Sequence, residues 1–315
     1  MGRLSALILG SAAGGGVPQW NCACEVCRLA WMGDPRVKRR TQTSVAVTCR
    51  PLADSNLADR SSDELTSPFI LLNASPDLRQ QILETPALQP QGLRASPIAA
   101  VVLTGGEVDQ VAGLLTMRER GAFAIYATAA TLAMLEANPI FGVLAEQAVI
   151  RTAVRASKPF MLPGGIECEL FPVPGKAPLY LEGDEPALDI QSEFNAGIEL
   201  RASGARLVFI PGAAKVTPEI AARIAEADAV LFDGTLFDDD EMITAGAGHK
   251  TGRRMGHMPV SGADGTLAAL KGLARRRVLI HINNTNPILI ADSPQLRAVE
   301  AAGFEVAEDG MRIEL

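Results

Sequence analysis

The sequence predicts an α/β protein that forms one domain with two similarly built halves. Short apolar runs rich in β-branched residues alternate with stretches of helical periodicity, which is typical of α/β chains. The 315 residues are 48% hydrophobic and 21% charged, as expected for a globular protein. No low-complexity linker divides the chain, so we expect residues 1–315 to form a single domain.

In the first half, strands are expected where an apolar run meets residues that favour turns. These runs are Leu4–Leu9, Thr43–Cys49, Phe69–Leu72 and Ala99–Leu103. Residues 50–68 are polar and interrupted by Pro, Asp and Ser, so we expect a mobile excursion loop there. Glu107–Arg120 has apolar residues at helical spacing and is expected to be a helix.

The second half repeats this alternation of strands and helices. Strands are expected at Glu167–Val173, Gly197–Leu200, Leu207–Ile210, Ala229–Phe232 and Arg277–Ile282. Helices are expected at Pro218–Ala227, Gly265–Arg275 and Pro294–Ala302. Asp309-Gly310 is a turn signal, which predicts a terminal hairpin between Glu305–Glu308 and Met311–Glu314.

The charge balance and hydropathy exclude some partners. Lys and Arg total 29 against 36 Asp and Glu, a net charge of −7, which disfavours nucleic-acid binding. No apolar run approaches the roughly 18 residues needed to cross a bilayer, so no membrane insertion is expected. The N-terminal apolar run is too short for a signal peptide, and we therefore expect a cytoplasmic location.

Three of the five cysteines stand within six residues, as Cys22, Cys24 and Cys27. Clustered thiols in a reducing compartment favour metal binding over disulfides. Three thiolates at this spacing can hold one face of a tetrahedral zinc ion and leave a fourth position open. The alternative is a set of buried thiols, which is less expected because apolar packing rarely selects cysteine three times.

Several predicted strands end in polar residues, and such ends gather at one edge of an α/β sheet. These ends are residues 73–77, 104–110, 233–235 and 281–284. A lone acid at a strand end, such as Glu107 or Asp109, is commonly a helix cap. Four polar ends together favour a shared pocket. Of the three histidines, His257 and His281 lie near these ends, and His249 is expected on the surface.

Several segments together resemble a family of pyrroloquinoline quinone (PQQ) biosynthesis proteins within the metallo-β-lactamase superfamily. They read LGSAAGGG (9–16), PQWNC (18–22), LLNASPD (71–77), TGRRMGHMPVSG (251–262) and LIHINNTNPIL (279–289). The resemblance runs from about residue 4 to the C-terminus, except for the excursion at residues 50–68. It implies an αββα sandwich of two packed mixed sheets with outer helices and a site along one edge.

The resemblance also implies a structural zinc ion held by Cys22, Cys24 and Cys27. In related phosphodiesterases, an H-x-x-H pair ends the last core strand, and its second histidine completes this zinc site. Here the pair reads His281 and Asn284. Asn284 is therefore the expected fourth ligand, with a water or a nearby side chain as the alternative.

The H-x-H-x-D-H motif of the superfamily falls on residues 105–110, where only Asp109 matches. Two further superfamily ligands would fall near Gly175 and Gly212 and are missing. Hydrolases of this fold use two zinc ions about 3.5–4 Å apart, and this chain lacks the ligands for them. A mixed set of His and carboxylate suits one Fe(II) ion that binds O₂. The implied iron ligands are Glu107, Asp109 and His281, and the implied catalytic pair is His257 and Asp233.

The implied activity is an iron- and O₂-dependent hydroxylation of the tyrosine ring in a cross-linked Glu–Tyr precursor of PQQ. The alternatives are a carrier that binds finished PQQ and, less expected, a hydrolase. Lys250, Arg253 and Arg254 crowd the loop before His257. Arg253 and Arg254 are expected to hold substrate carboxylates, unless this is only a solvated basic loop.

The strand-end residues Asn73 and Ser75 are also expected to contact the substrate. The expected partner is thus a small molecule. Whether the protein forms a homodimer stays open.

Overall fold

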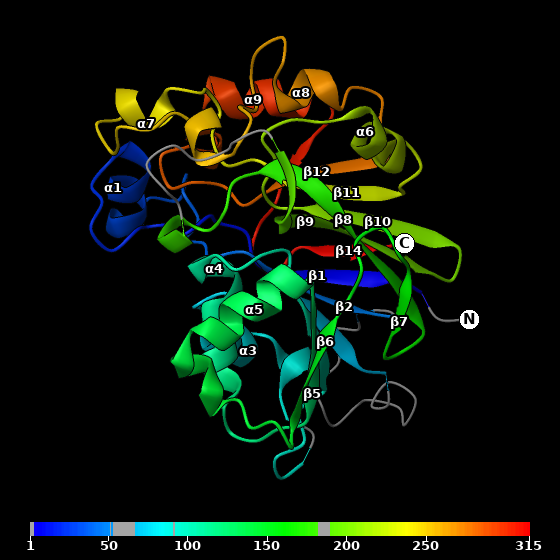
Figure 1. Ribbon diagram of the computed structural model, residues 1–315. Helices are drawn as coiled ribbons and strands as arrows, with labels where there is room; N and C mark the ends of the chain where they lie inside the picture. The colour runs from blue at the N-terminus through cyan, green and yellow to red at the C-terminus, as the bar shows by residue number, and fades with distance from the viewer. Residues whose placement is uncertain (1–2, 51, 53–66, 91, 182–189) are drawn as a thin grey trace.

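A computed structural model describes residues 3–50, 52, 67–90, 92–181 and 190–315. Over these residues, two sheets pack face to face and helices cover both outer faces (Figure 1). The αββα sandwich implied by the resemblance is therefore confirmed. The excursion loop expected at 50–68 lies mostly outside the described residues. No helix within the described part of the chain is long and apolar enough to span a membrane.

The first sheet has the strand order β14-β1-β2-β3-β4-β5-β6 over the described residues. β1 pairs antiparallel with β2 and with β14, and β3 to β6 run parallel. β3 and β4 are almost wholly apolar because parallel strands are covered on both faces. The bounds are β1 (Ser5–Gly10), β2 (Ser44–Thr48), β3 (Phe69–Leu72), β4 (Ile98–Val102), β5 (Phe123–Ala127), β6 (Val149–Ala153) and β14 (Arg312–Glu314).

The second sheet has the order β13-β12-β11-β10-β9-β8-β7 over the same part of the chain. Its strands are antiparallel from β7 to β10 and parallel from β10 to β13. The bounds are β7 (Phe160–Leu162), β8 (Ile166–Gly175), β9 (Ile190–Ala202), β10 (Ala205–Ile210), β11 (Ala229–Asp233), β12 (Arg276–Ile280) and β13 (Glu305–Val306).

Helices α3, α4 and α5 lie beside the first sheet, and α6 to α9 lie over the second (Figure 1). Side-chain caps begin several of them: the Thr217 hydroxyl accepts from the Ile220 N–H, and Ser293 caps α9 in the same way. The bounds are α1 (Glu25–Met32), α3 (Leu78–Glu84), α4 (Val108–Val111), α5 (Ala129–Ala137), α6 (Pro218–Ala225), α7 (Glu241–Thr244), α8 (Thr266–Ala269) and α9 (Pro294–Ala301). Short 3₁₀ segments lie at Pro86–Leu88, Ala112–Met117, Pro139–Val143, Leu179–Leu181, Arg253–Met255 and Pro287–Leu289.

The apolar core has three layers. One lies between the sheets, and one lies between each sheet and its helices. The middle layer is filled by alternating side chains of both sheets, including Ile8, Leu170 and Phe209. This packing fixes the strand ends at the edge where the candidate site lies.

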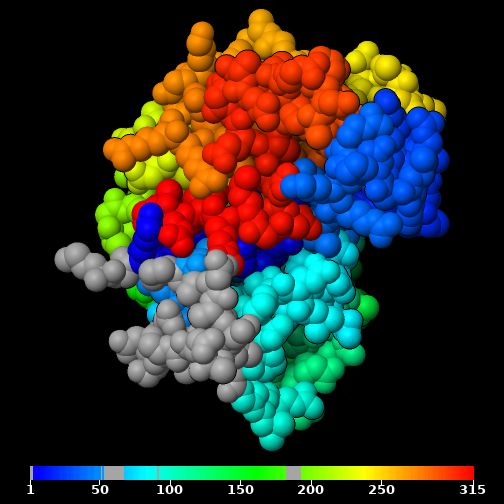
Figure 2. Space-filling view, turned by 180° about the vertical axis from the view of Figure 1, so that it is seen from behind, coloured from blue at the N-terminus to red at the C-terminus, as the bar shows by residue number. Residues whose placement is uncertain are grey.

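The predicted terminal hairpin is wrong. β13 pairs with β12 in the second sheet, and β14 pairs with β1 in the first, so the two strands belong to different sheets. The intervening residues cross from one sheet to the other, and the Asp309 carboxylate accepts four hydrogen bonds from Ser11 and Thr41 there. Seen from behind, the red C-terminal and blue N-terminal segments run side by side through the middle of the molecule (Figure 2).

Two predicted helices are shorter than expected. Glu107–Arg120 becomes α4 followed by a 3₁₀ segment, because the backbone at Gly113 docks on the loop after β3; a Cβ there would meet the Ser75 carbonyl oxygen at 2.1 Å. In Gly265–Arg275, the helix ends at Ala269, and Gly272 and Ala274 adopt positive φ.

Candidate metal centres and substrate cavity

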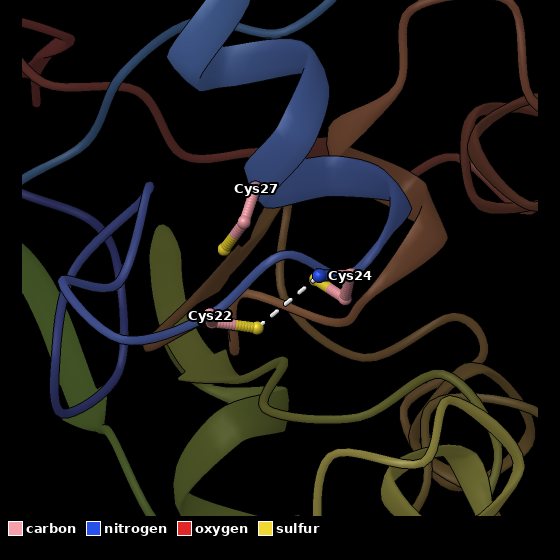
Figure 3. A group of neighbouring side chains, drawn as sticks. All are labelled: Cys22, Cys24 and Cys27. Carbon is pink, nitrogen blue, oxygen red and sulfur yellow. Dashed lines mark hydrogen bonds between the residues drawn. The ribbon is translucent and has the colours of Figure 1, made fainter.

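The three clustered cysteines meet at the N-terminus of α1. Cys22 lies in the preceding loop, Cys24 at the helix cap and Cys27 in the first turn, and their thiols point toward one another (Figure 3). The three sulfur atoms lie within 4.8 Å of one another. A zinc ion with Zn–S bonds of about 2.3 Å requires sulfurs this close, so the thiols fit the expected structural zinc.

Asn284 closes the fourth side of this group, as expected from the sequence. Its amide nitrogen lies 3.2 Å from the Cys22 sulfur, 3.3 Å from that of Cys27 and 3.7 Å from that of Cys24. A half-turn of the amide would present its oxygen to a metal held by the three thiolates. Asn284 comes from the loop after β12, so the zinc would tie the N-terminal loop to the second sheet.

The thiols differ in acidity in the metal-free protein. Burial and the two neighbouring thiols raise the pKa of Cys24 to about 12. Burial also acts on Cys22, but hydrogen bonds from the Cys24 N–H and from neighbouring side chains outweigh it and lower the pKa of Cys22. A metal at this site would therefore displace protons from at least one thiol whose ionisation is unfavourable in its absence.

A second group lies at the carboxyl ends of β11 and β12, as the polar strand ends predicted. Asp233 ends β11, His281 follows β12, and His257 lies in the loop between α7 and α8. Ligand atoms of these three residues lie within 4.8 Å of one another. The two imidazole rings stack with their centroids 5.3 Å apart.

Each histidine of this group is paired with a carboxylate. The Asp233 Oδ2 atom lies 2.7 Å from Nδ1 of His257. The Asp109 Oδ2 atom lies 2.9 Å from Nε2 of His281. Asp109 stands in the first turn of α4, beside the first sheet, whereas His281 belongs to the second. The two halves of the chain therefore meet at this pair.

These pairings shift the pKa values of Asp109, Asp233 and His281. Burial alone would raise the pKa of Asp109 and of Asp233, but the adjacent histidines outweigh it and lower both. Burial alone would lower the pKa of His281, but the hydrogen bond that its Nε2–H donates to Asp109 and the nearby carboxylates raise it. A metal ion bound at His281 would compete with the proton that these carboxylates favour.

Glu107, the third expected iron ligand, takes part in different contacts. Its carboxylate lies 3.4 Å from the Lys176 ammonium and accepts from the Leu179 N–H at 3.1 Å. It also forms a capping box with Gln110 at the start of α4. Glu107 faces the same cavity as Asp109 and His281, but it would have to leave Lys176 to reach a metal there.

The positions that carry further metal ligands in the superfamily are closed in this protein. A Cβ at Gly175 would lie 2.3 Å from the Asn195 amide nitrogen, which bonds the Gly212 carbonyl. A Cβ at Gly212 would lie 3.2 Å from the His257 ring, and one at Gly105 would lie 2.6 Å from the Gln110 amide oxygen. Asn195, His257 and Gln110 thus lie directly beside the positions of the missing ligands.

A cavity of about 780 Å³ opens over the paired histidines. This volume is within the range of small-molecule sites, about 300–1,000 Å³. The wall includes apolar and aromatic side chains and two lysines, Lys176 and Lys250. Those apolar residues are Val108, Leu179, Tyr180, Phe194 and Met255.

The expected substrate-binding residues do not reach this cavity. Neither Arg253 nor Arg254 is among the described residues that line it, and the Arg253 guanidinium bonds the exposed Asp264 carboxylate at 2.5 Å instead. Asn73 is buried, and its amide bonds Thr104, which joins the ends of β3 and β4. Ser75 is buried against Ser44 and Gln81. Polar strand ends can thus serve the scaffold as well as the site.

Three residues of the site were not predicted from the sequence. Thr235 lies between the two histidines, Asn195 lies beside the position of a missing ligand, and Lys176 lines the cavity. Thr235 had a weak signal, since it stands two residues after Asp233 at a polar strand end. Lys176 and Asn195 had none, because only the pairing of β8 with β9 brings them to the site.

Comparison with known proteins agrees with this fold. Residues 69–282 match the family model described as "Beta-lactamase superfamily domain". The chain is 51% identical over 311 residues to coenzyme PQQ synthesis protein B of Methylorubrum populi, covering 98% of this chain and 99% of that protein. It is 47% identical over 313 residues to the protein of that name in Rhizobium meliloti, covering 99% and 98%.

Solved structures show the same relationship. The Zn²⁺-bound PqqB from Methylobacterium extorquens superposes with a TM-score of 0.91 at 49% identity, covering 99% of this chain and 100% of that one. A diphosphatase of the PhnP family gives a TM-score of 0.64 at 20% identity, covering 99% and 97%, and shares the fold. The protein is thus a metallo-β-lactamase-fold protein. Within that superfamily, it belongs to the coenzyme PQQ synthesis protein B family.

Proposed function

We propose that this protein is an iron- and O₂-dependent hydroxylase of the tyrosine ring in a cross-linked Glu–Tyr precursor of PQQ. The observation that carries the proposal is the single His281–Asp109 pair at the base of the cavity, with Asn195, His257 and Gln110 directly beside the positions of further metal ligands. Imidazole and carboxylate ligands with open positions are typical of mononuclear non-haem Fe(II) sites, most often as two histidines and one carboxylate. This site offers one histidine and up to two carboxylates.

The donor atoms fit such an ion. His281 would offer Nε2 and Asp109 its carboxylate, and Glu107 would join by leaving Lys176. Bound Fe(II) would supply the binding and activation of O₂ that no protein side chain can provide. The thiol group at α1 is separate and suits zinc, because thiolate ligands favour zinc and carboxylates favour harder ions.

His257 is suited to move a proton. Asp233 accepts its Nδ1 proton, so the unprotonated ring nitrogen is Nε2, on a ring that lines the cavity. Each hydroxylation replaces a ring C–H by C–OH with one oxygen atom of O₂. The other oxygen leaves as water after taking two protons and two electrons from an external two-electron reductant. His257 would accept the proton released from the phenol or the ring carbon.

The cavity also suits this substrate. The apolar wall can pack on a tyrosine ring, and Lys176 and Lys250 lie where ammonium groups can meet carboxylates. We therefore assign carboxylate binding to these lysines in place of Arg253 and Arg254. Substituting Lys176 by Met should raise KM more than it lowers kcat, because it removes a binding contact and not a reacting group.

The test measures metal content together with oxygen consumption. The chain is purified without oxygen and supplied with Fe(II). Zinc and iron per chain are then quantified in the wild type, in His281→Ala and in His249→Ala, an exposed histidine that serves as the control. A synthetic cross-linked Glu–Tyr compound and a reductant are the assay substrates.

We expect about one zinc in all three proteins, with iron and O₂-dependent hydroxylation lost only in His281→Ala. Zinc alone, with no iron uptake and no oxygen consumption by the wild type, would refute the hydroxylase. Tight PQQ binding in that case would favour the carrier, for which the volume and the lysines of the cavity are also suitable.

A further inference from the structure

The hydroxyl of Thr235 lies between the two stacked histidines. Thr235 is 4% exposed and follows β11 after the tight turn at Gly234, where a Cβ would lie 2.9 Å from that of Leu279. Its Oγ1 atom lies 2.6 Å from Asp233 Oδ1, 3.1 Å from His257 Nδ1 and 2.9 Å from His281 Nδ1. It also lies 3.0 Å from the carbonyl oxygen of His281.

The hydrogens available on these groups determine which atom donates and which accepts in each hydrogen bond. A threonine hydroxyl donates one hydrogen and accepts others. Asp233 Oδ1 is the nearest acceptor and is charged, so it receives the Thr235 proton in preference to the carbonyl oxygen. The Nδ1 proton of His257 goes to Asp233 Oδ2 at 2.7 Å. Thr235 is then left to accept the Nδ1 proton of His281.

In this arrangement each carboxylate oxygen of Asp233 accepts two hydrogen bonds. Oδ1 accepts from the Thr235 N–H and hydroxyl, and Oδ2 accepts from the Ala213 N–H and from His257. A carboxylate with four donors has no remaining lone pair for a metal. Asp233 therefore acts by orienting its neighbours, directly for His257 and through Thr235 for His281.

We propose that Thr235 is a positioning residue that extends the hydrogen bonding of Asp233 to His281, holds the proton on Nδ1 of that ring and leaves Nε2 as its metal-binding nitrogen. The proposal rests on the proposed function only in that His281 binds a metal ion; it depends neither on iron nor on O₂. Groups that fix the second nitrogen of a ligating histidine commonly contribute about 10–100-fold to metal affinity.

The test compares Thr235→Val, which removes the hydroxyl at nearly constant volume, with Thr235→Ser, which keeps it. Thr266→Val is the control, because Thr266 is also fully buried and its hydroxyl makes only a 3.4 Å contact with the Pro259 carbonyl. Each protein is labelled with ¹⁵N-histidine and titrated with Zn²⁺ alone. The chain has three histidines, so the imidazole spectrum is simple to assign.

In the zinc-saturated wild type and in Thr235→Ser, we expect His281 to show a slowly exchanging Nδ1 proton and a metal-bound Nε2. In Thr235→Val the Nδ1 proton should exchange rapidly with solvent, and the second zinc ion should bind about 10–100-fold more weakly. If the valine variant does not fold, Thr235→Ala removes the same hydroxyl and should give the same result.

An unchanged Nδ1 signal in Thr235→Val, with zinc affinity within about threefold of the wild type, would overturn the proposal. A similar loss in Thr266→Val would also overturn it, because the effect would then follow from any buried hydroxyl. The proposed hydroxylase activity can be refuted independently of this proposal. Zinc affinity and the Nδ1 signal of His281 respond to Thr235 even if the protein consumes no oxygen.

Discussion

Pairing with a carboxylate gives His257 and His281 different roles. His281 turns Nε2 toward Asp109, a potential co-ligand, whereas His257 turns Nδ1 toward Asp233, whose oxygens already have four donors. Sequence position alone could not separate these roles, because both histidines follow apolar or glycine-rich segments and look equally suited to bind metal. The difference arises from which carboxylate the fold places beside each ring.

His257→Gln is therefore expected to keep its iron and lose turnover. Glutamine fills most of the space but cannot accept and release a proton, so kcat should fall about 10²–10⁴-fold. Metal analysis and steady-state oxygen uptake check this, with His281→Gln as the variant that loses iron. Loss of iron from His257→Gln would show instead that His257 is a ligand.

Glu241 gives a second prediction at this scale, for stability. It is the buried first residue of α7, and its carboxyl accepts from the Phe237 N–H and the Thr285 hydroxyl. Burial raises its pKa to about 7 from 4.5. The folded state then holds the proton more tightly than the unfolded chain. The contribution of Glu241 to the free energy of unfolding is complete below the pKa that this residue has in the unfolded chain. It is lost as the pH rises toward the pKa of Glu241 in the folded protein.

Between these two pH values, the free energy of unfolding should fall by about 3 kcal/mol because of Glu241. Glu241→Gln, which mimics the neutral acid, should flatten this dependence. Urea unfolding at several pH values measures it, with exposed Glu300→Gln as the control. An equally steep dependence in Glu241→Gln would assign the titration to another group.

At the scale of elements, apolar runs predicted most of the central strands, because strands covered on both faces must be apolar along their whole length. β5, β6 and β7 were missed. β6 and β7 are edge strands with exposed residues, and β5 alternates buried and half-buried residues. α1 was missed because it begins within the thiol loop. Its N-terminal cap is Cys24, which makes no side-chain cap hydrogen bond, so its position depends on the thiol group.

Removing one thiol should therefore destabilise this element. In Cys27→Ser, we expect loss of the zinc ion and a melting temperature lower by at least about 5 °C, because metal binding contributes directly to folding. Metal analysis and calorimetry measure the two effects. Cys49→Ser is the control, a half-buried thiol outside the cluster. Full zinc content in Cys27→Ser would show that the remaining thiols suffice.

At the scale of the whole molecule, the two sheets are joined where the chain crosses between β13 and β14. The sequence predicted a hairpin there because Asp309-Gly310 is a turn signal, and a local signal cannot show that the flanking strands join different sheets. The Asp309 carboxylate accepts from the backbone and the hydroxyl of both Ser11 and Thr41. It therefore links the crossing to the loops after β1 and before β2.

Asp309→Ala should leave two backbone N–H groups without an acceptor and lower the free energy of unfolding by about 3 kcal/mol or more. Denaturant unfolding measures this, and Glu300→Ala on the exposed face of α9 is the matched control. A loss below about 1 kcal/mol would mean that solvent replaces the carboxylate at the crossing.

The pairing of β14 with β1 also sets an order of events during synthesis. β1 is made long before its neighbour on the outer side, which consists of residues 312–314. The first sheet therefore cannot be completed before residues 312–314 have been made. Until then β1 exposes an open backbone edge, the kind of surface that pairs with other chains. A nascent chain stalled before residue 312 should thus be more prone to aggregate than the finished protein.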